Sequence, residues 1–182
     1  MIEEARHAFR LDNEVLAFRF TATLSLRNSP APLERLSGPD RLRLWLAAAG
    51  LDPRHMPASV DVLPATILRE AIYRLGAAIA HDSVPAARDF DAVNAVAAAG
   101  HPTPVLSRAG LRWQLDSISD ALAVIARDAI TTLGTPGAGR VKTCDDPGCA
   151  GLFLDTSRGT NRRWCSMNTC GNKAKKTRMA QR

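Results

Sequence analysis

Cysteine and lysine are absent from most of this chain. The first lysine is Lys142 and the first cysteine is Cys144, so both residue types are confined to the C-terminal part. Aromatic residues are also scarce, at 5% of the 182 residues. Because alanine and the aliphatic residues are frequent instead, the composition favours one mainly helical body of ordinary domain size, followed by a small module.

The chain also lacks the signals of export, membrane insertion and common enzyme classes. No apolar run reaches the ~18–20 residues that a membrane span requires. The N-terminal residues Met1 to Glu4 end in two acids where an export signal is basic. We therefore expect a cytoplasmic protein with no membrane partner. No phosphate loop, dinucleotide fingerprint or nucleophile elbow is present, and the four histidines are scattered. The sequence predicts no enzyme.

Positive charge is concentrated at the C-terminus. Residues 140–182 contain ten Lys and Arg against three Asp, which is a net charge of +7. Residues 1–139 contain fourteen Arg against fifteen Asp and Glu, a net charge of −1. A near-neutral body with a strongly basic appendage is typical of a protein that binds a polyanion. The alternative is that the basic residues only keep a small module soluble.

Hydrophobic spacing predicts several helices in the body. A start at Ser37 to Asp40 and a stop at Gly50 bound the first of these helices. A broad apolar stripe predicts the longest helix over residues 61–80, with Pro64 tolerated in its first turn. A further helix is expected over 85–99 with Phe90 buried.

Other segments of the body predict short β elements and turns. Apolar residues alternate over 16–26, which predicts a half-buried strand or two short ones. Residues 105–115 resemble a hairpin that turns at Ala109-Gly110. Ser117 and Asp120 have the spacing of a capping box, with Asp in place of the usual Glu or Gln, and predict the start of a last body helix.

These elements divide the chain into a body over 1–134, a Gly/Pro linker over 135–139 and a module over 140–182. The predicted fold class is mainly α with small β elements, an α+β arrangement. It consists of a helical N-terminal domain and a C-terminal treble-clef-like zinc finger, for which the cysteines provide the main argument.

Four cysteines, the only ones in the chain, form two pairs of the type C-x4-C with fifteen residues between them: Cys144, Cys149, Cys165 and Cys170. Two closely spaced thiol pairs can converge on one tetrahedral Zn²⁺, which prefers four soft ligands in a closed structural site. Two disulfides are an alternative that a reducing compartment disfavours. Iron can also occupy four thiolates, so the spacing alone leaves the metal open.

The order of elements around the cysteines is that of a treble clef. A tight turn at Pro147 and Gly148 brings the first pair together. Residues 152–154 are expected to leave as a strand, turn through 157–161 and return through 162–164. A terminal helix follows Cys170, and Phe153 and Trp164 form a small apolar core beside the metal.

Basic residues around this site are candidates for nucleic-acid contacts. The terminal segment is basic nearly all round if it is helical, which suits phosphate contacts in a groove. The turn of the hairpin offers candidates for reading bases. Arg162, Arg163 and Lys173 have an alternative role, which is to offset the charge of the thiolate site. The candidate residues are Arg158, Asn161, Arg162, Arg163, Lys173, Lys175, Lys176, Arg178 and Arg182.

The module resembles the CGNR zinc-finger family in Phe153 to Arg158, in Arg163 to Met167 and in Cys170 to Lys173, where Lys173 replaces the Arg of the family motif. Segments around Trp45 and Leu68 are similar to the ABATE domain that precedes this finger in the family. The resemblance implies a stress-linked transcription regulator. After Leu24 to Leu26 the family tends to have an acidic residue, and this chain has Arg27.

The leading hypothesis is therefore a zinc-dependent DNA-binding transcription regulator, with one structural zinc and a body that senses a small-molecule effector or forms a homodimer. Two alternatives remain open. Treble-clef-like modules also bind RNA, and an exposed Trp164 can stack on a base. The zinc can instead hold a surface for a protein partner.

Overall fold

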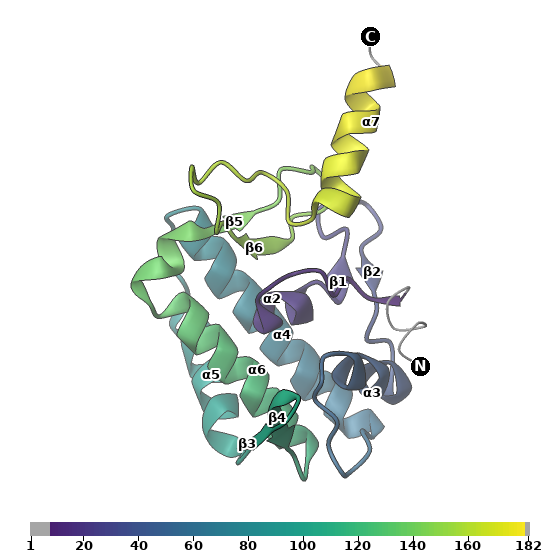
Figure 1. Ribbon diagram of the computed structural model, residues 1–182, viewed down its shortest axis with the longest axis vertical. Helices are drawn as coiled ribbons and strands as arrows, with labels where there is room; N and C mark the ends of the chain where they lie inside the picture. The colour runs from purple at the N-terminus through teal and green to yellow at the C-terminus, as the bar shows by residue number, and fades with distance from the viewer. Residues whose placement is uncertain (1–7, 181–182) are drawn as a thin grey trace.

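The computed structural model describes residues 8–180 and is mainly helical (Figure 1). In the described part of the body, two short strands lie between α2 and α3 and two more between α5 and α6. In the C-terminal region a two-stranded sheet precedes a last helix. The body elements are α2 (Leu16–Thr21), β1 (Leu24–Ser25), β2 (Leu33–Glu34), α3 (Pro39–Ala48), α4 (Ser59–Ala80), α5 (Ala87–Ala99), β3 (Thr103–Ser107), β4 (Gly110–Gln114) and α6 (Ile118–Leu133). The C-terminal elements are a 3-10 turn η1 (Pro136–Arg140), β5 (Val141–Thr143), β6 (Leu152–Leu154), a π-helical turn η2 (Met167–Gly171) and α7 (Asn172–Ala180). The predicted mixture of helices and small sheets is confirmed.

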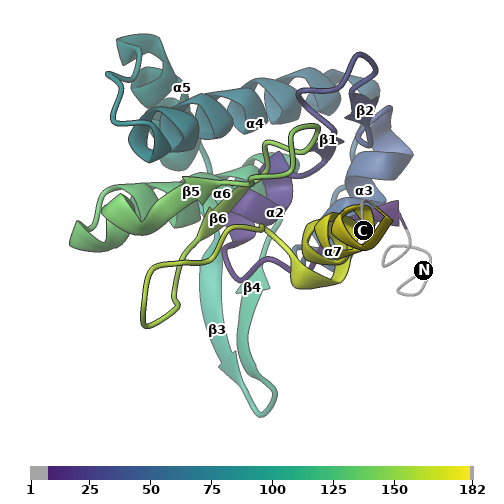
Figure 2. The ribbon, with the colours of Figure 1, turned by 90° about the horizontal axis from the view of Figure 1, so that it is seen from above.

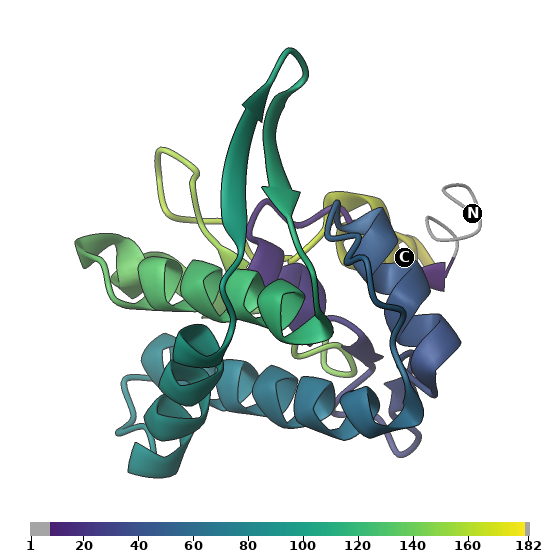
Figure 3. The same ribbon diagram turned by 90° about the horizontal axis from the view of Figure 1, so that it is seen from below.

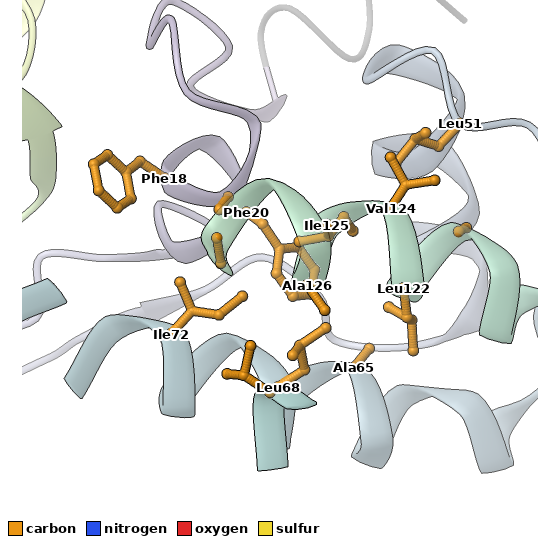
Figure 4. Close-up of a cluster of buried hydrophobic side chains, with 14 of the residues drawn as sticks. Phe18, Phe20, Leu51, Ala65, Leu68, Ile72, Leu122, Val124, Ile125 and Ala126 are labelled. Atoms are coloured by element: carbon orange, nitrogen blue, oxygen red, sulfur yellow. The ribbon is translucent and has the colours of Figure 1, made fainter. Parts of the chain in front are cut away.

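The hydrophobic core of the body lies between α4, α6 and α2 (Figure 4). From α4, Leu68 and Ile72 point toward α6, and both are fully buried. From α6, Ile125 is fully buried in the same layer, and Phe20 of α2 fills the space beside it. Most of the apolar stripe predicted for the longest helix thus faces the core, although Ile67, which belongs to that stripe, is 52% exposed.

The capping box at the start of α6 is confirmed. The Asp120 backbone N–H donates to Ser117 Oγ at 3.2 Å, and the Ser117 N–H donates to Asp120 Oδ2 at 2.8 Å. Asp120 also accepts from the backbone N–H groups of His101 and Asp116, so this one carboxylate fixes the loop before the helix as well. These bonds satisfy N–H groups that a helix start leaves without partners.

The strand predicted over 16–26 is wrong for its first half. Residues Leu16–Thr21 form helix α2, and only Leu24–Ser25 is a strand. The alternation of apolar residues misled because no residue of this helix is fully exposed: Ala17, Phe18 and Phe20 are 0% exposed, and Leu16 and Arg19 are half-buried. A segment without a fully exposed side has little need for a periodic pattern, so its pattern is a poor guide to its secondary structure.

Two smaller expectations also need correction. Phe90 was expected in the core but is 48% exposed, because α5 buries the face that carries Asp89, Val93 and Ala97. Asp89 can lie on that face because its carboxylate pairs with Arg74 at 2.6 Å.

The hairpin β3–β4 projects from the body (Figure 3), and its turn lies one residue earlier than the predicted Ala109-Gly110. Ser107 pairs with Gly110, so Arg108 and Ala109 form the turn.

The segment predicted as a Gly/Pro linker is folded against the body. Residues Pro136–Arg140 form a 3-10 turn, and the next strand, β5, pairs antiparallel with β6 on top of α4. Figure 2 shows this sheet lying across the helices of the body. Val141 and Leu152 belong to the same hydrophobic cluster as the body core. The predicted division of the chain into a body over 1–134, a linker over 135–139 and a module over 140–182 stays a prediction.

Leu152 is the residue through which this sheet enters the body. It is 2% exposed, and it lies so close to α4 that a Cβ added at Gly76 would be 2.6 Å from Leu152 Cδ1. Glycine at this position therefore permits the close approach of sheet and helix.

We expect Leu152→Ala to lower the free energy of unfolding of the whole chain by about 2–5 kcal/mol, because it leaves a cavity between sheet and helix. Denaturant unfolding followed by far-UV circular dichroism measures this loss. Leu63→Ala is the matched control: Leu63 is 66% exposed, and its truncation should change stability by less than about 0.5 kcal/mol. Equal effects of the two substitutions would contradict the described packing.

Candidate metal centre and nucleic-acid interface

The four cysteines meet at one point. Their sulfur atoms all lie within 4.8 Å of one another, and all four residues are buried. Cys149 Sγ lies 3.7 Å from Cys165 Sγ, which lies 3.8 Å from Cys170 Sγ. A regular tetrahedron with Zn–S bonds of about 2.3 Å has sulfur–sulfur edges of about 3.8 Å. The sulfur positions fit one zinc ion with no open coordination position, which is the arrangement of a structural site.

Backbone hydrogen bonds shape the first cysteine pair into a knuckle. The Cys144 N–H donates to Gly151 O at 2.9 Å, and the Cys149 N–H donates to Asp146 O at 2.9 Å. Ala150 adopts a φ of 50°, in the left-handed region, as the chain leaves the turn. Phe153 is fully buried beside the cysteines, and Trp164 packs against the same cluster, as predicted.

The predicted hairpin of the finger is wrong in its pairing. Strand β6 pairs with β5, which precedes the knuckle in the chain, and residues 162–164 form no strand. The return segment instead makes a single backbone bond to the knuckle, from the Asp145 N–H to Arg163 O at 2.9 Å. Cys170 comes from the π-helical turn η2, and α7 starts at Asn172, so the expected terminal helix is confirmed.

Asp155 organises the loop between β6 and the second cysteine pair. Its carboxylate is fully buried and accepts from Lys142 Nζ at 2.6 Å and from the N–H groups of Ser157 and Arg162 at 3.0 Å each. The hydrogen bond from Lys142 is the main cause that holds the pKa of Asp155 well below its usual range. The loop over 155–162, which carries Arg158 and Asn161, is therefore held at its base by one charged group.

Arg10, a residue of the body, contacts the metal centre. Its Nη1 donates to Cys149 Sγ at 3.3 Å, and its Nη2 lies 3.4 Å from Cys165 Sγ and 3.3 Å from Cys170 Sγ. Burial lowers the pKa of Arg10. The charge of Cys165 and the hydrogen bonds to Cys170 and Cys149 outweigh burial, so the pKa lies above its ordinary value. Sequence reasoning missed this residue, because 139 to 160 positions separate it from the cysteines and no local pattern marks it.

Three of the predicted nucleic-acid residues are engaged within the finger. Arg162 donates to Trp164 O at 2.9 Å and to Cys165 O at 2.7 Å, so its guanidinium supports the backbone of the metal site. Arg163 pairs with Asp145 at 2.6 Å, and Lys173 pairs with Asp146 at 3.0 Å. The side chains of Arg163 and Lys173 remain 66% and 63% exposed, so these are surface pairs that a phosphate can replace.

The other predicted residues are open to solvent. Over residues 8–180, the structure gives no ion pair for Arg158, Lys175, Lys176 or Arg178, and all four are exposed. Asn161 is exposed too, with its side chain near Ser157. Helix α7 buries no residue and extends away from the body (Figure 1). Arg182 lies outside the described residues. The structure thus separates open basic residues from those that stabilise the finger, and the nucleic-acid contacts themselves remain a prediction.

Arg27, which stands where the resembled family tends to have an acid, has a structural partner. It forms a two-point ion pair with Glu70 at 2.7 and 3.1 Å, and its guanidinium lies 3.8 Å from the centre of the Tyr73 ring. Glu70 also accepts from the buried Arg69 at 2.7 Å. The positive charge of Arg27 is thus neutralised by Glu70 within the body.

A cleft of about 710 Å³ opens where the metal centre meets the body. Its walls carry Arg35 and Lys173 as well as Asp12 and Asp146, so they present both signs of charge. The cleft is large enough for a small molecule. Because its walls carry both signs of charge, the cleft does not indicate whether a ligand would be an anion or a cation. The small-molecule effector stays a prediction.

We expect one zinc ion per chain in native mass spectrometry. Cys170→Ala should abolish it, since a three-sulfur site loses most of the binding free energy, which is on the order of 10 kcal/mol for a four-ligand structural site. Asn168→Ala, a change at an exposed position two residues away, should leave the stoichiometry at one. Full zinc retention in the Cys170 variant would contradict the assignment of this ligand.

Comparison with family models gives two matches in the expected order. Residues 14–136 match the ABATE family, described as "Putative stress-induced transcription regulator", and residues 140–182 match the CGNR zinc finger. No curated protein matches the chain. In the described part of the chain, no helix is long and apolar enough to span a bilayer. The chain belongs to the ABATE family and carries a C-terminal CGNR zinc finger.

Proposed function

We propose that this protein is a zinc-dependent transcription regulator that binds DNA through its CGNR finger. The observation that carries the proposal is the set of unpaired cations on the finger. Arg158 lies in the loop held by Asp155, and Lys175, Lys176 and Arg178 lie on α7. The loop and the helix both lie on the side of the finger turned away from the body (Figure 1).

Helix α7 has the size and the surroundings of a helix that docks on nucleic acid. It has nine residues and buries none of them. A helix this short is marginally stable in water without tertiary packing, so contacts with phosphates would stabilise it. A single α-helix fits the major groove of B-DNA, and its basic side chains can reach the phosphates on either side.

The role of zinc in this proposal is to hold the base of α7. Cys170 is two residues before the start of the helix, and Cys144, Cys149 and Cys165 fix Cys170 to the knuckle. Zinc loss would free the last ligand and the helix that follows it. The closed four-sulfur site offers no position for a substrate, and we infer that the protein is not an enzyme.

RNA binding is the second candidate, and a groove beside Trp164 favours it. The groove has a volume of about 380 Å³ and is lined by Arg163, Trp164, Lys175 and Arg178, among others. An aromatic ring between cations suits a base with its phosphate. Arg163 already covers the ring at 5.0 Å from its centre, so a base must displace this guanidinium to stack there.

We expect the Lys175→Ala/Arg178→Ala variant to bind duplex DNA about 10- to 100-fold more weakly near 100 mM salt. The slope of log K against log salt should become shallower by about 2, because each lost phosphate contact removes about one released counterion. Fluorescence anisotropy over a salt series measures both quantities. The control is Arg43→Ala/Arg54→Ala, which removes two exposed cations from the body.

Truncation of the finger is a poor substitute for these point changes, because Val141 and Leu152 belong to the body core. If the α7 variant binds duplex DNA with unchanged affinity and salt slope, the helix is not part of the DNA interface. Tighter binding to a structured RNA in competition would favour the second candidate. If the finger instead binds a protein partner, with an affinity that barely changes between ~50 and 200 mM salt, the finger is a surface for protein interaction.

Selection of duplexes from a random library by the zinc-loaded protein would test sequence specificity. An enriched palindrome would also support a homodimer, which stays a prediction.

A further inference from the structure

Residues 8–15, here called the strap, run between the body and the finger. Two apolar side chains of the strap, Phe9 and Val15, are buried in the body core. The Arg41 guanidinium lies 4.8 Å from the centre of the Phe9 ring, and Arg35 Nη1 donates to Ala8 O at 2.6 Å. The body thus anchors the strap at both of its ends.

Between these anchors, two polar side chains of the strap reach the finger. Asn13 Nδ2 donates to Leu152 O at 2.9 Å, and Arg10 donates to three of the four cysteine sulfurs. Arg10 Nη2 also donates to Thr169 Oγ1 at 2.5 Å. The strap therefore connects the body to the metal end of the finger, in addition to the contact of Leu152 with α4.

The three sulfurs that Arg10 contacts come from different parts of the finger. Cys149 belongs to the knuckle, Cys165 to the return segment and Cys170 to the turn before α7. A small module of this kind owes most of its folding free energy to the metal. Without zinc, nothing comparable would keep these sulfurs within reach of one guanidinium. With zinc, four thiolates and one Zn²⁺ carry a formal charge of −2, which attracts Arg10.

We propose that Arg10 acts as a positioning residue that ties the metal centre of the finger to the body, so that zinc binding and docking of the second cysteine pair stabilise each other. Leu152 holds β6, and through it β5, against α4 by contacts that do not involve the cysteine sulfurs. The segment from Cys165 to α7 is held by zinc and, through the sulfurs, by Arg10. Because coupling is reciprocal, loss of the Arg10 contacts must weaken zinc binding, and loss of zinc must release the strap.

The first test measures the zinc affinity of the full-length protein by competition with a chelating dye. We expect Arg10→Ala to lower the affinity about 10- to 100-fold, as second-shell changes at metal sites do. Arg10→Lys should fall in between, because it keeps the charge and loses the two-pronged contact. Arg43→Ala, at an exposed position on α3, is the matched control and should bind zinc like the unaltered protein.

A spectroscopic measurement separates this role from simple packing. In the Co²⁺-substituted protein, the sulfur-to-metal charge-transfer bands report the donor strength of the thiolates. Hydrogen bonds from Arg10 stabilise the sulfur lone pairs, so Arg10→Ala should shift these bands to lower energy, and Arg10→Lys should shift them less. A variant that keeps both the affinity and the band positions of the unaltered protein would overturn the proposal.

Trypsin tests the reverse direction of the coupling in the unaltered protein. The peptide bond after Arg10 should resist cleavage in the zinc-loaded form, because trypsin must bind the side chain that the sulfurs hold. Chelation of zinc should accelerate cleavage there by at least tenfold relative to the bond after Arg54, whose side chain is 70% exposed. Equal relative rates with and without zinc would show that the metal does not hold the strap, and would overturn the proposal without bearing on DNA binding.

Discussion

The packing of Leu152 against Gly76 is the contact on which the arrangement of this protein depends. It brings strand β6 onto the longest helix of the body, and β5 follows because it pairs with β6. Since the knuckle lies between these two strands, the packing of Leu152 also places the first cysteine pair relative to the body. The second pair meets the first at a place where Arg10 of the strap reaches the sulfurs. The metal centre is thus a junction of three segments that are distant in sequence.

The charge of the finger is used in two different ways. Its three aspartates each have a basic partner: Asp145 pairs with Arg163, Asp146 with Lys173 and Asp155 with Lys142. These pairs and the support that Arg162 gives to the backbone shape the metal site and its loop. A net charge of +7 over residues 140–182 therefore overstates what is open to a partner. In the part of the finger that the structure describes, three cations without an acidic partner, Lys175, Lys176 and Arg178, lie on α7, which extends away from the body (Figure 1).

The sequence predicted the parts of this structure that depend on local chemistry. Four thiols in two close pairs predict a metal site because four soft ligands can converge on one ion. Ser117 with Asp120 predicts a helix start because the two residues are close in sequence. Prediction failed where the surroundings decide. Helix α2 has no fully exposed side, so the alternation of its residues is a poor guide to its secondary structure. Phe90 is exposed because α5 buries the face that carries Asp89, whose carboxylate pairs with Arg74 on α4. The position of Arg10 follows from tertiary packing alone, and it lies before the segment that matches the ABATE model.

Arg10 of the strap and the turn that leads into α7 meet at the metal centre, and this gives the zinc site a role beyond the stability of the finger. Arg10 contacts Cys170 Sγ at 3.3 Å, and α7 begins two residues later at Asn172. A shift of the strap that breaks this contact would remove one of the restraints on the base of the helix, while Leu152 keeps β5 and β6 in place. The direction of α7 relative to the body is therefore more sensitive to the metal centre than the position of the sheet is. If α7 binds DNA, its orientation depends on contacts from Arg10 and Thr169 that lie outside the four ligands themselves.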